Sequence, residues 1–354
     1  MGGMDEGSAT APGRRGRPGP SIQDVARLAG VSMQTVSRVA NGSSVVRPTT
    51  RDRVLAVMRE VGYSPNQAAR ALRRGRFNTI GLIAHQLERT GESRTIGAVV
   101  EAARREGYTV TLVNVDEPSS ADVTAAATLL DNQSIDGLII IRAEAATPDT
   151  LVLPPGLPVV VADSRLAGRH PLVAADQAGG TREAVRHLLG LGHRTVHHLA
   201  GPADSDPATA RLHAWQEELA RAGGDVPPVW RGDWSAGSGY AVGREMADDT
   251  SVTAVCCAND EMAVGLIRAL VEHGRRVPED VSVVGFDDIP LAPYLTPPLT
   301  SIHHDFDRLG RELVDLLVAQ MRDHEPPVPR RVLVPSRLVV RRSTARPPGV
   351  SRSA

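Results

Sequence analysis

Polar side chains follow four apolar runs of the sequence, and their types suit the binding of a ligand. Asp163 follows PVVVA, Asp176 follows LVAA, Asn259 and Asp260 follow AVCCA, and Asp287 and Asp288 follow SVVGF. Carboxylates accept charge-assisted hydrogen bonds from the hydroxyls of a polyol, and a pair of carboxylates can also hydrolyse a glycosidic bond. Each residue alone also suits the N-cap of a following helix, which is the role we expect of Asp176 and Asp260. The recurrence of the pattern favours a polar cleft.

From Thr79 onward, apolar runs alternate with helical segments, and these elements must position the polar residues. The expected strands are 79–84, 108–115, 135–141, 158–163, 172–176, 195–201, 254–260 and 282–288. The expected helices lie near 93–106, 119–132, 177–191, 207–222, 236–248, 260–273 and 306–321. This alternation predicts parallel sheets covered by helices on both faces. Ligands of such sheets bind at the carboxyl ends of the strands, where the polar residues lie.

Three short helices are predicted before this region, at 21–29, 32–40 and 48–61. Ser21 with Asp24 forms a capping-box pattern, Ser32 suits an N-cap and Pro48 suits a first helical turn. The expected shared core consists of Val25, Leu28, Val31, Val36, Val39, Val54, Leu55 and Met58. The first two helices, joined by a tight turn, form a helix-turn-helix whose second helix fits the major groove of DNA.

Charge is distributed unevenly along the chain. Residues 1–76 carry 13 arginines against five acidic residues, a formal charge of +8, whereas the rest carries 27 arginines against 36 acidic residues, a charge of −9. A basic head on an acidic body suggests that the head meets a polyanion. The adjacent Cys256 and Cys257 suit a buried strand in a reducing compartment. Without an apolar run long enough for a membrane span or a signal peptide, we expect a cytoplasmic, nucleoid-associated protein without membrane contact.

The head and the body both resemble the LacI family of bacterial transcription repressors. The resemblance rests on DVARLAGVSMQTVSRVANG and YSPNQAARALRRG, and then on LGHRTVHHLAGP, ARLHAW, GDWSAGSGY, ANDEMAVG, SVVGFDD and PPLTSIHHDF. It covers about residues 21–343. It implies a small all-α helix-turn-helix headpiece followed by an α/β core like that of periplasmic sugar-binding proteins, with two doubly wound parallel-sheet subdomains and a ligand cleft between them.

The domain boundaries expected from this resemblance are as follows. A tail at 1–20 precedes the DNA-binding domain at 21–63 and a hinge linker at 64–77; the core spans 78–343, and a second tail spans 344–354. Within the core, the N-subdomain takes 78–175 and 303–333, and the C-subdomain takes 176–302 and 334–343.

Residues of the second helix are the candidates for DNA contact. Met33, Gln34 and Arg38 are expected at base edges, because Arg reads guanine and Gln reads adenine. The expected phosphate contacts, which position the helix, are Ser32, Thr35, Ser37 and Asn41. By resemblance, 66–74 is a hinge helix in which Asn66 contacts DNA, Ala69 lets two hinge helices approach and Leu72 enters the minor groove. A plain arginine-rich linker is the alternative for that segment.

The effector contacts come from the resemblance, position by position. They are Asp163, Arg211, Trp234, Asn259, Asp287 and His304. Carboxylates and a guanidinium chelate adjacent hydroxyls, and the face of Trp234 stacks on a sugar ring, although it also suits a core aromatic. Glu92 or Ser93, at the start of a helix beside the cleft, is a further candidate for a ligand contact.

The expected function is a DNA-binding repressor of sugar-utilisation genes, released by a β-galactoside-like sugar. A purine or a sugar phosphate is the alternative effector. A sugar-binding receptor or a hydrolase without DNA binding is a third possibility. We expect a homodimer on a pseudo-palindromic operator of double-stranded DNA, because the chain ends without the leucine heptads by which a family member joins dimers. We expect no catalytic residue, no cofactor and no metal.

Overall fold

The protein is described by a computed structural model that covers residues 20–63, 76–117, 119–141, 149–162, 169–323 and 330–348. The chain divides into two compact units, 1–75 and 76–354. The expected hinge contacts Asn66, Ala69 and Leu72, and the expected effector contact Asp163, lie outside the described residues. Within the described residues, no helix has the length and apolarity that crossing a membrane requires.

Three helices form the first unit: α1 (Ile22–Ala29), α2 (Met33–Ala40) and α3 (Pro48–Val61). The capping box is confirmed, since the Ser21 hydroxyl accepts from the Asp24 amide and the Asp24 carboxylate accepts from the Ser21 amide. The Ser32 hydroxyl likewise caps α2 by accepting from the amide of Thr35. Both caps bond amides that a helix leaves without internal partners, so the local sequence alone starts these helices at the expected residues.

The core of the first unit is smaller than expected. Val25, Val36, Val39, Val54 and Met58 are buried, together with Ala26, Ala29 and Val46. Leu28 and Leu55 were expected in this core, but they are 55% and 39% exposed. The reason is geometric: such short helices bury one stripe of residues, and in α1 the buried residues Val25, Ala26 and Ala29 lie on a face that leaves Leu28 outside.

The second unit contains two six-stranded sheets. The first sheet has the order β11-β5-β4-β3-β1-β2, with β1 (Thr79–His85), β2 (Thr109–Val115), β3 (Gly137–Ile141), β4 (Val159–Ala162), β5 (Leu172–Ala175) and β11 (Arg331–Val334). The second has the order β12-β10-β9-β8-β6-β7, with β6 (His197–Ala200), β7 (Trp230–Arg231), β8 (Ala254–Cys257), β9 (Ser282–Asp287), β10 (Thr300–His304) and β12 (Ser336–Val339). All pairs are parallel except β10 with β12, so the expected fold class is confirmed with one antiparallel edge strand added.

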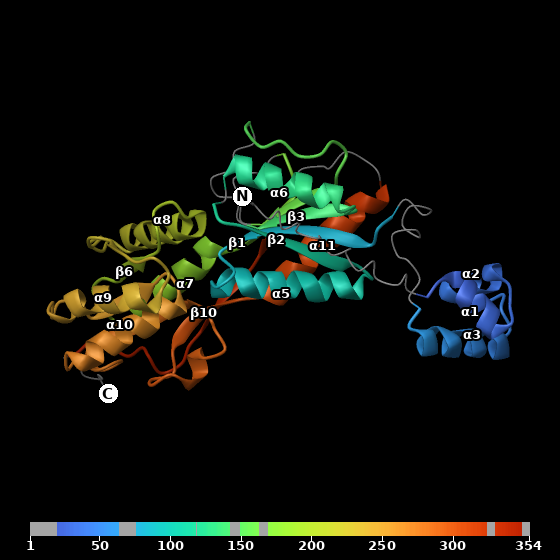
Figure 1. Cartoon of the computed structure of the whole chain (residues 1–354). Helices are drawn as coiled ribbons and strands as arrows, with labels where there is room; N and C mark the ends of the chain where they lie inside the picture. The colour runs from blue at the N-terminus through green and yellow to red at the C-terminus, as the bar shows by residue number, and fades with distance from the viewer. Residues whose placement is uncertain are drawn as a thin grey trace, which may run out of the picture. The chain divides into compact units, whose positions relative to one another are not determined.

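Helices cover both faces of each sheet (Figure 1). On the first sheet, α5 (Thr90–Arg105) and α11 (Phe306–Asp323) pack on one face and α6 (Ser120–Asn132) packs on the other. On the second sheet, α9 (Ala236–Ala247) and α10 (Asp260–Glu272) pack opposite α7 (Gln177–Gly190) and α8 (Asp206–Arg221). Cys256 and Cys257 are buried in β8 without a disulfide, as expected of core residues.

The chain passes between the two sheets three times. It leaves the first sheet after β5, returns between β10 and α11, and leaves again between β11 and β12. Strands β7, β10, β11 and β12 were absent from the expected strands, because they are short and their sequences mix polar and apolar residues. The consequence for function is that the carboxyl ends of strands from both sheets can contribute to one cleft.

Helices α9 and α10 approach so closely that a Cβ atom at Gly265, as at Gly239, would meet backbone atoms of the other helix. A Cβ atom at Gly265 would lie 1.9 Å from the carbonyl oxygen of Ala236 and 2.6 Å from the amide nitrogen of Tyr240, both backbone atoms. Overpacking costs about 1–3 kcal/mol or more, so Gly265→Ala should destabilise the protein by about 3 kcal/mol in a thermal melt. The matched control is Gly97→Ala in α5, where a Cβ meets nothing within 4 Å and helix propensity should raise the melting temperature slightly. Equal melting temperatures of the two variants would contradict the close approach of α9 and α10.

Candidate functional site

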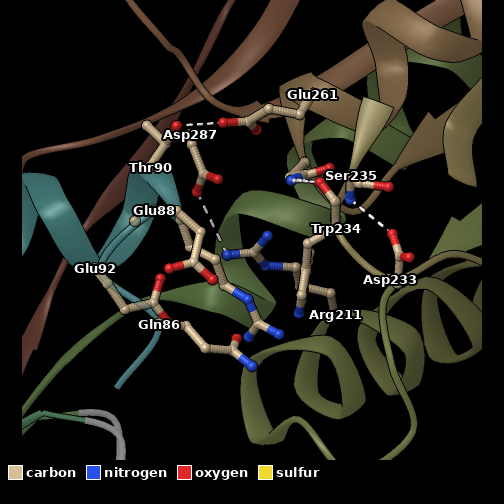
Figure 2. Close-up of a pocket in the computed structure, with 13 residues that line it drawn as sticks. Gln86, Glu88, Thr90, Glu92, Arg211, Asp233, Trp234, Ser235, Glu261 and Asp287 are labelled. Atoms are coloured by element: carbon tan, nitrogen blue, oxygen red, sulfur yellow. Dashed lines mark hydrogen bonds and ion pairs between the residues drawn. The ribbon is translucent and has the colours of Figure 1, made fainter. Parts of the chain in front are cut away.

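A cavity of about 420 Å³ lies between the two halves of the second unit (Figure 2). Residues after β1 and at the start of α5 form one wall. Residues that follow β7 and β8, the last residue of β9 and Arg211 of α8 form the other. The lining consists of Gln86, Glu88, Arg89, Thr90, Gly91, Glu92, Arg211, Asp233, Trp234, Ser235, Asn259, Glu261 and Asp287. The volume lies in the range of small-molecule sites, and the position at the strand ends is the one that the sequence predicts.

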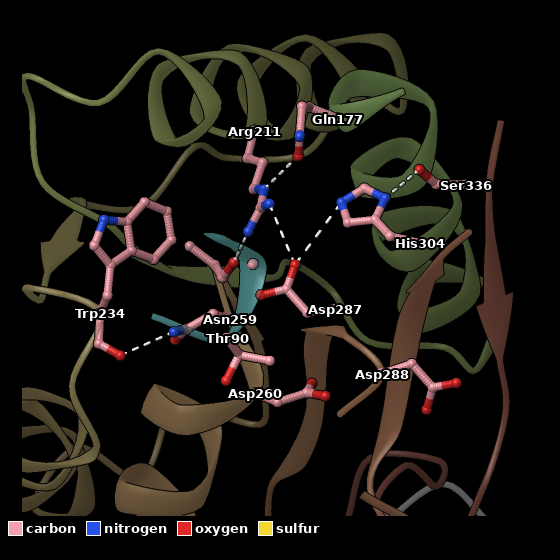
Figure 3. Close-up of polar contacts among 12 residues, drawn as sticks. Thr90, Gln177, Arg211, Trp234, Asn259, Asp260, Asp287, Asp288, His304 and Ser336 are labelled. Carbon is pink, nitrogen blue, oxygen red and sulfur yellow. Dashed lines mark hydrogen bonds and ion pairs between the residues drawn. The ribbon is translucent and has the colours of Figure 1, made fainter. Parts of the chain in front are cut away.

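Arg211, on α8, is the buried cation of this site, with an exposed side-chain fraction of 2%. Its Nε donates to Gln177 Oε1 at 2.8 Å, its Nη1 donates to the carbonyl oxygen of Ala258, and its Nη2 lies 3.5 Å from Asp287 Oδ1 (Figure 3). The guanidinium carbon lies 3.7 Å from the centre of the Phe286 ring, an arrangement that permits a cation–π interaction. The guanidinium group of Arg211 is therefore held in one orientation by contacts on several sides.

Asp287 ends β9 with a positive φ of 98°, a backbone conformation that costs free energy in a residue other than glycine. Its Oδ1 lies between Nη2 of Arg211 and Nε2 of His304, which is 3.8 Å away. His304 is buried, bonds the Ser336 hydroxyl through Nδ1 at 2.8 Å, and is absent from the residues that line the cavity. The neighbouring Asp288 pairs instead with Arg341, at 2.7 Å. Thus Asp287 faces the cavity while His304 lies behind it.

Trp234 and Asn259 form the adjoining part of the wall. Trp234 has a φ of 78° and is 8% exposed, and a Cβ atom on Gly201 would lie 2.6 Å from its ring. Asn259 Oδ1 accepts from the amide of Met262, and its Nδ2 donates to the carbonyl oxygen of Trp234 at 2.9 Å (Figure 3). Asn259 therefore ties the loop that carries the indole to the start of α10.

The opposite wall comes from the first turn of α5, earlier than the expected helix start at 93. Glu92 lines the cavity and is 1% exposed, whereas Ser93 is exposed and its hydroxyl donates to the carbonyl oxygen of Thr90. Thr90 donates through its hydroxyl to Glu261 across the cavity. Arg94 Nη1 donates to the carbonyl oxygens of Asp287 and Asp288 at 3.2 and 3.3 Å. These contacts join the two halves beside the cavity.

The two expected N-caps have different outcomes. Asp176 caps α7 by accepting from the amide of Gly179, which confirms the prediction. The prediction for Asp260 is wrong, because Asn259 is the N-cap of α10. Asp260 is fully buried instead, accepting from the Ser301 hydroxyl at 2.6 Å and from the amide of Ile289 at 2.8 Å. Burial raises the pKa of this carboxyl well above its usual value. Its two hydrogen bonds link the start of α10 to β10 and to the chain after β9.

The adjacent histidines of β6, His197 and His198, are both buried. His198 donates from Nδ1 to the carbonyl oxygen of Cys256 and stacks on Trp215. Burial lowers the pKa of His198 to about 4 from its ordinary 6.5. Across the described residues, no group of three or more His, Cys, Asp or Glu side chains is placed to hold a metal ion.

This shift predicts a pH dependence of stability. Between pH 6.5 and 4 the unfolded chain binds a proton at His198 that the folded protein excludes, so the free energy of unfolding should fall as the pH falls through this range. In His198→Asn, whose amide can replace the Nδ1 donor, that slope should be shallower. Chemical denaturation at several pH values between 4 and 7 measures both slopes. If the free energy of unfolding depended on pH alike in the wild type and in His198→Asn, His198 would not be the source of the dependence.

On the first unit, α2 presents the expected DNA contacts on its outer face. Met33, Gln34 and Arg38 are exposed, opposite the buried Val36 and Val39. Asn41 donates from Nδ2 to the carbonyl oxygen of Ser37 at 2.7 Å and to its hydroxyl at 3.3 Å, and the hydroxyls of Ser32 and Thr35 lie 3.0 Å apart. These four side chains thus already have intrahelical or capping contacts, and Ser32 and Asn41 remain exposed.

Sequence reasoning missed several residues that build the cavity. Gln177 and Phe286 hold the guanidinium of Arg211, and Thr90 and Glu261 join the two walls. Gln177 directly follows a strand-end aspartate, and Glu261 belongs to the quoted ANDE string, so position after a strand end was the available signal. The partner of Glu261 lies 171 residues away, which no local pattern reveals.

Comparison with known proteins gives matches over both units. Residues 21–66 match the family described as bacterial regulatory proteins, lacI family, and residues 185–344 match a periplasmic binding protein-like domain. The chain is 36% identical to the lactose operon repressor of Escherichia coli over 92% of this chain and 91% of that protein. The crystal structure of the lac repressor dimer bound to operator and the anti-inducer ONPF superposes with a TM-score of 0.81 at 34% identity, covering 92% of this chain and 99% of that one.

Two further relatives bear on the ligand. The transcriptional regulator CelR of Thermobifida fusca is 35% identical over 92% of this chain and 98% of that protein. A structure of the CelR–cellobiose complex matches with a TM-score of 0.66 and 32% identity, covering 92% and 99% of the two chains. The transcriptional repressor PurR of Haemophilus influenzae is 32% identical over 91% of this chain and 98% of that protein.

Proposed function

Because the chain belongs to the LacI family of DNA-binding transcriptional repressors, we propose that it represses sugar-utilisation genes and releases its operator when a sugar occupies the cavity. The observation that carries the effector half of this proposal is the buried pair of Arg211 and Asp287 at the cavity wall. A fixed guanidinium and a carboxylate together present donors and acceptors to adjacent hydroxyls, which is the pattern a polyol requires.

Each site residue has a distinct role in this proposal. Asp287 and Arg211 bind vicinal hydroxyls, Asn259 holds the indole-bearing loop, and the face of Trp234 covers the apolar side of a sugar ring. His304 does not line the cavity and its Nε2 lies 3.8 Å from the Asp287 carboxylate, so it acts on the ligand through Asp287. Sugar binding would change the contacts between the two walls, and linkage then requires that operator DNA weaken sugar binding by the same factor as sugar weakens operator binding.

The headpiece reads the operator as a dimer. Met33, Gln34 and Arg38 are exposed on α2 and meet base edges in the major groove. Two copies of the chain present two such helices to a pseudo-palindromic operator. A titration of operator length and half-site spacing against protein oligomer size tests this arrangement.

A purine effector is the second candidate, because PurR is among the relatives. A base sandwiched between aromatic rings needs two of them, and Trp234 is the one aromatic side chain among the described lining residues. A sugar phosphate is disfavoured by the acidic lining. A hydrolase would show saturable turnover of a glycoside that Asp287→Ala abolishes.

Calorimetric titration with a panel of mono- and disaccharides, with and without the promoter DNA of the protein's own gene, tests the proposal. A sugar that binds and releases the DNA supports an inducible repressor and identifies its effector. Binding of hypoxanthine or guanine alone would overturn the sugar assignment while leaving DNA binding intact.

A further inference from the structure

The lining of the cavity carries an excess of negative charge. Five acidic side chains line it against two arginines: Glu88, Glu92, Asp233, Glu261 and Asp287 against Arg89 and Arg211. Pairing Arg211 with Asp287 leaves four acidic side chains and one arginine, a formal excess of three negative charges. Like charges repel across a low-dielectric cavity, and the lining therefore favours a ligand that carries positive charge over one that carries negative charge.

Glu261 is a carboxylate of this set that joins the two walls of the cavity and has an incomplete set of hydrogen bonds. It extends from the first turn of α10, and its Oε1 accepts from the hydroxyl of Thr90 (Figure 2). Its Oε2 is buried and has no hydrogen-bond partner among the described residues. A buried acceptor without a donor costs free energy, so a ligand that brings a donor to this oxygen gains what the free protein lacks.

The nature of the missing donor follows from the charge at Glu261. Burial raises the pKa of the Glu261 carboxyl above its usual value. The side chain that bonds it among the described residues, Thr90, is a neutral hydroxyl, and the amino end of α10 supplies only a partial positive charge, so a full positive charge on the ligand would stabilise the carboxylate form. We propose that Glu261 is the specificity-determining residue of the cavity and binds a protonated amine of the effector, which is therefore an amino sugar. This inference rests on the sugar effector proposed above and narrows it to one chemical class.

Thr90 has a separate role in this arrangement. It is the first residue of α5, beside the first sheet, whereas Glu261 lies in the first turn of α10, beside the second. Their hydrogen bond therefore joins the two walls. One carboxylate oxygen then connects the walls while the other binds the ligand. Removing the Thr90 hydroxyl should change the affinity for all sugars by a similar factor, while removing the charge of Glu261 should change the affinity for amino sugars alone.

The experiment compares matched sugars on the full-length protein by calorimetry. The panel pairs glucose and galactose with their 2-amino, 3-amino and 6-amino derivatives and with the N-acetyl form of each amine. The amine that binds best should exceed its parent sugar by about tenfold or more, as a charge-assisted bond allows, and N-acetylation should remove this gain. Glu261→Gln should reduce the ratio of the affinity for the amine to that for the parent sugar to nearly one, whereas Thr90→Val should retain this ratio.

The outcomes separate the inference from the proposed function. Equal binding of parent sugar and amine, or a preference that survives Glu261→Gln, overturns the amine assignment and leaves the sugar effector standing. If no sugar of either kind binds, both fail. If Glu261→Gln does not fold, the comparison of amine with its N-acetyl form on the wild type still decides, because it removes the ligand's charge without changing the protein.

Discussion

Arg211→Ala is expected to lose effector affinity by about a hundredfold or more, because truncating a buried charged partner in a binding site costs about 2–5 kcal/mol of binding free energy, while operator binding is retained. The substitution also leaves Asp287, which is 10% exposed, without its arginine partner. Breaking a buried ion pair lowers the free energy of unfolding by about 3–5 kcal/mol. It also removes the donor that fixes Gln177. Calorimetry with a sugar that binds the wild type, together with an operator-binding assay, measures both effects. Operator binding should persist because the headpiece is a separate compact unit.

Two further variants separate charge from geometry at this position. Arg211→Lys keeps the positive charge but lacks the planar fork, so it should recover much of the stability and little of the affinity. Arg194→Ala, which removes an arginine that is 92% exposed and 3.6 Å from Asp225, should change neither measurement. If Arg211→Lys bound the sugar as tightly as the wild type, the planar shape of the guanidinium group would have no specific role in binding.

Much of the fold could be predicted because the apolar runs and the helix-capping residues of the sequence both indicate the elements that form. The continuous apolar run at 137–141 forms the fully buried β3, and Ser119, the residue before α6, caps that helix by accepting from the amide of Asp122. Strands such as β10 and β12 could not be found in this way. Their pairing depends on a chain that returns to the second sheet from the first, and sequence periodicity carries no information about such a return.

The identity of the residues that line the candidate site could be predicted from the sequence, but most of their hydrogen-bond partners could not. Arg211, Trp234, Asn259 and Asp287 all line one cavity, as their resemblance to a known family implied. The exchange of roles between Asn259 and Asp260 was not predictable, because both residue types cap helices well. Strand β8 ends at Cys257, three residues before the expected end, and Asp260 lies in the interior, where it accepts from the Ser301 hydroxyl.

Arg38→Ala is expected to remove most of the sequence preference of the headpiece. A bidentate contact of Arg with guanine contributes about 1–3 kcal/mol of discrimination, which corresponds to roughly 5- to 150-fold in affinity. Binding to DNA of unrelated sequence should weaken only slightly, because phosphate contacts supply most of it. Fluorescence anisotropy at one salt concentration, with the promoter fragment and a scrambled fragment of equal length, measures the ratio of the two affinities.

Arg27→Ala is the matched control for this prediction. Arg27 is an exposed arginine of α1, 75% accessible and 3.3 Å from Asp24, so its removal takes away the same charge from the same unit without touching the outer face of α2. Both variants lose equal long-range attraction to DNA, and only Arg38→Ala should lose discrimination. If the two variants reduced the affinity ratio alike, Arg38 would act through charge alone, and base recognition would have to be assigned to Met33 and Gln34.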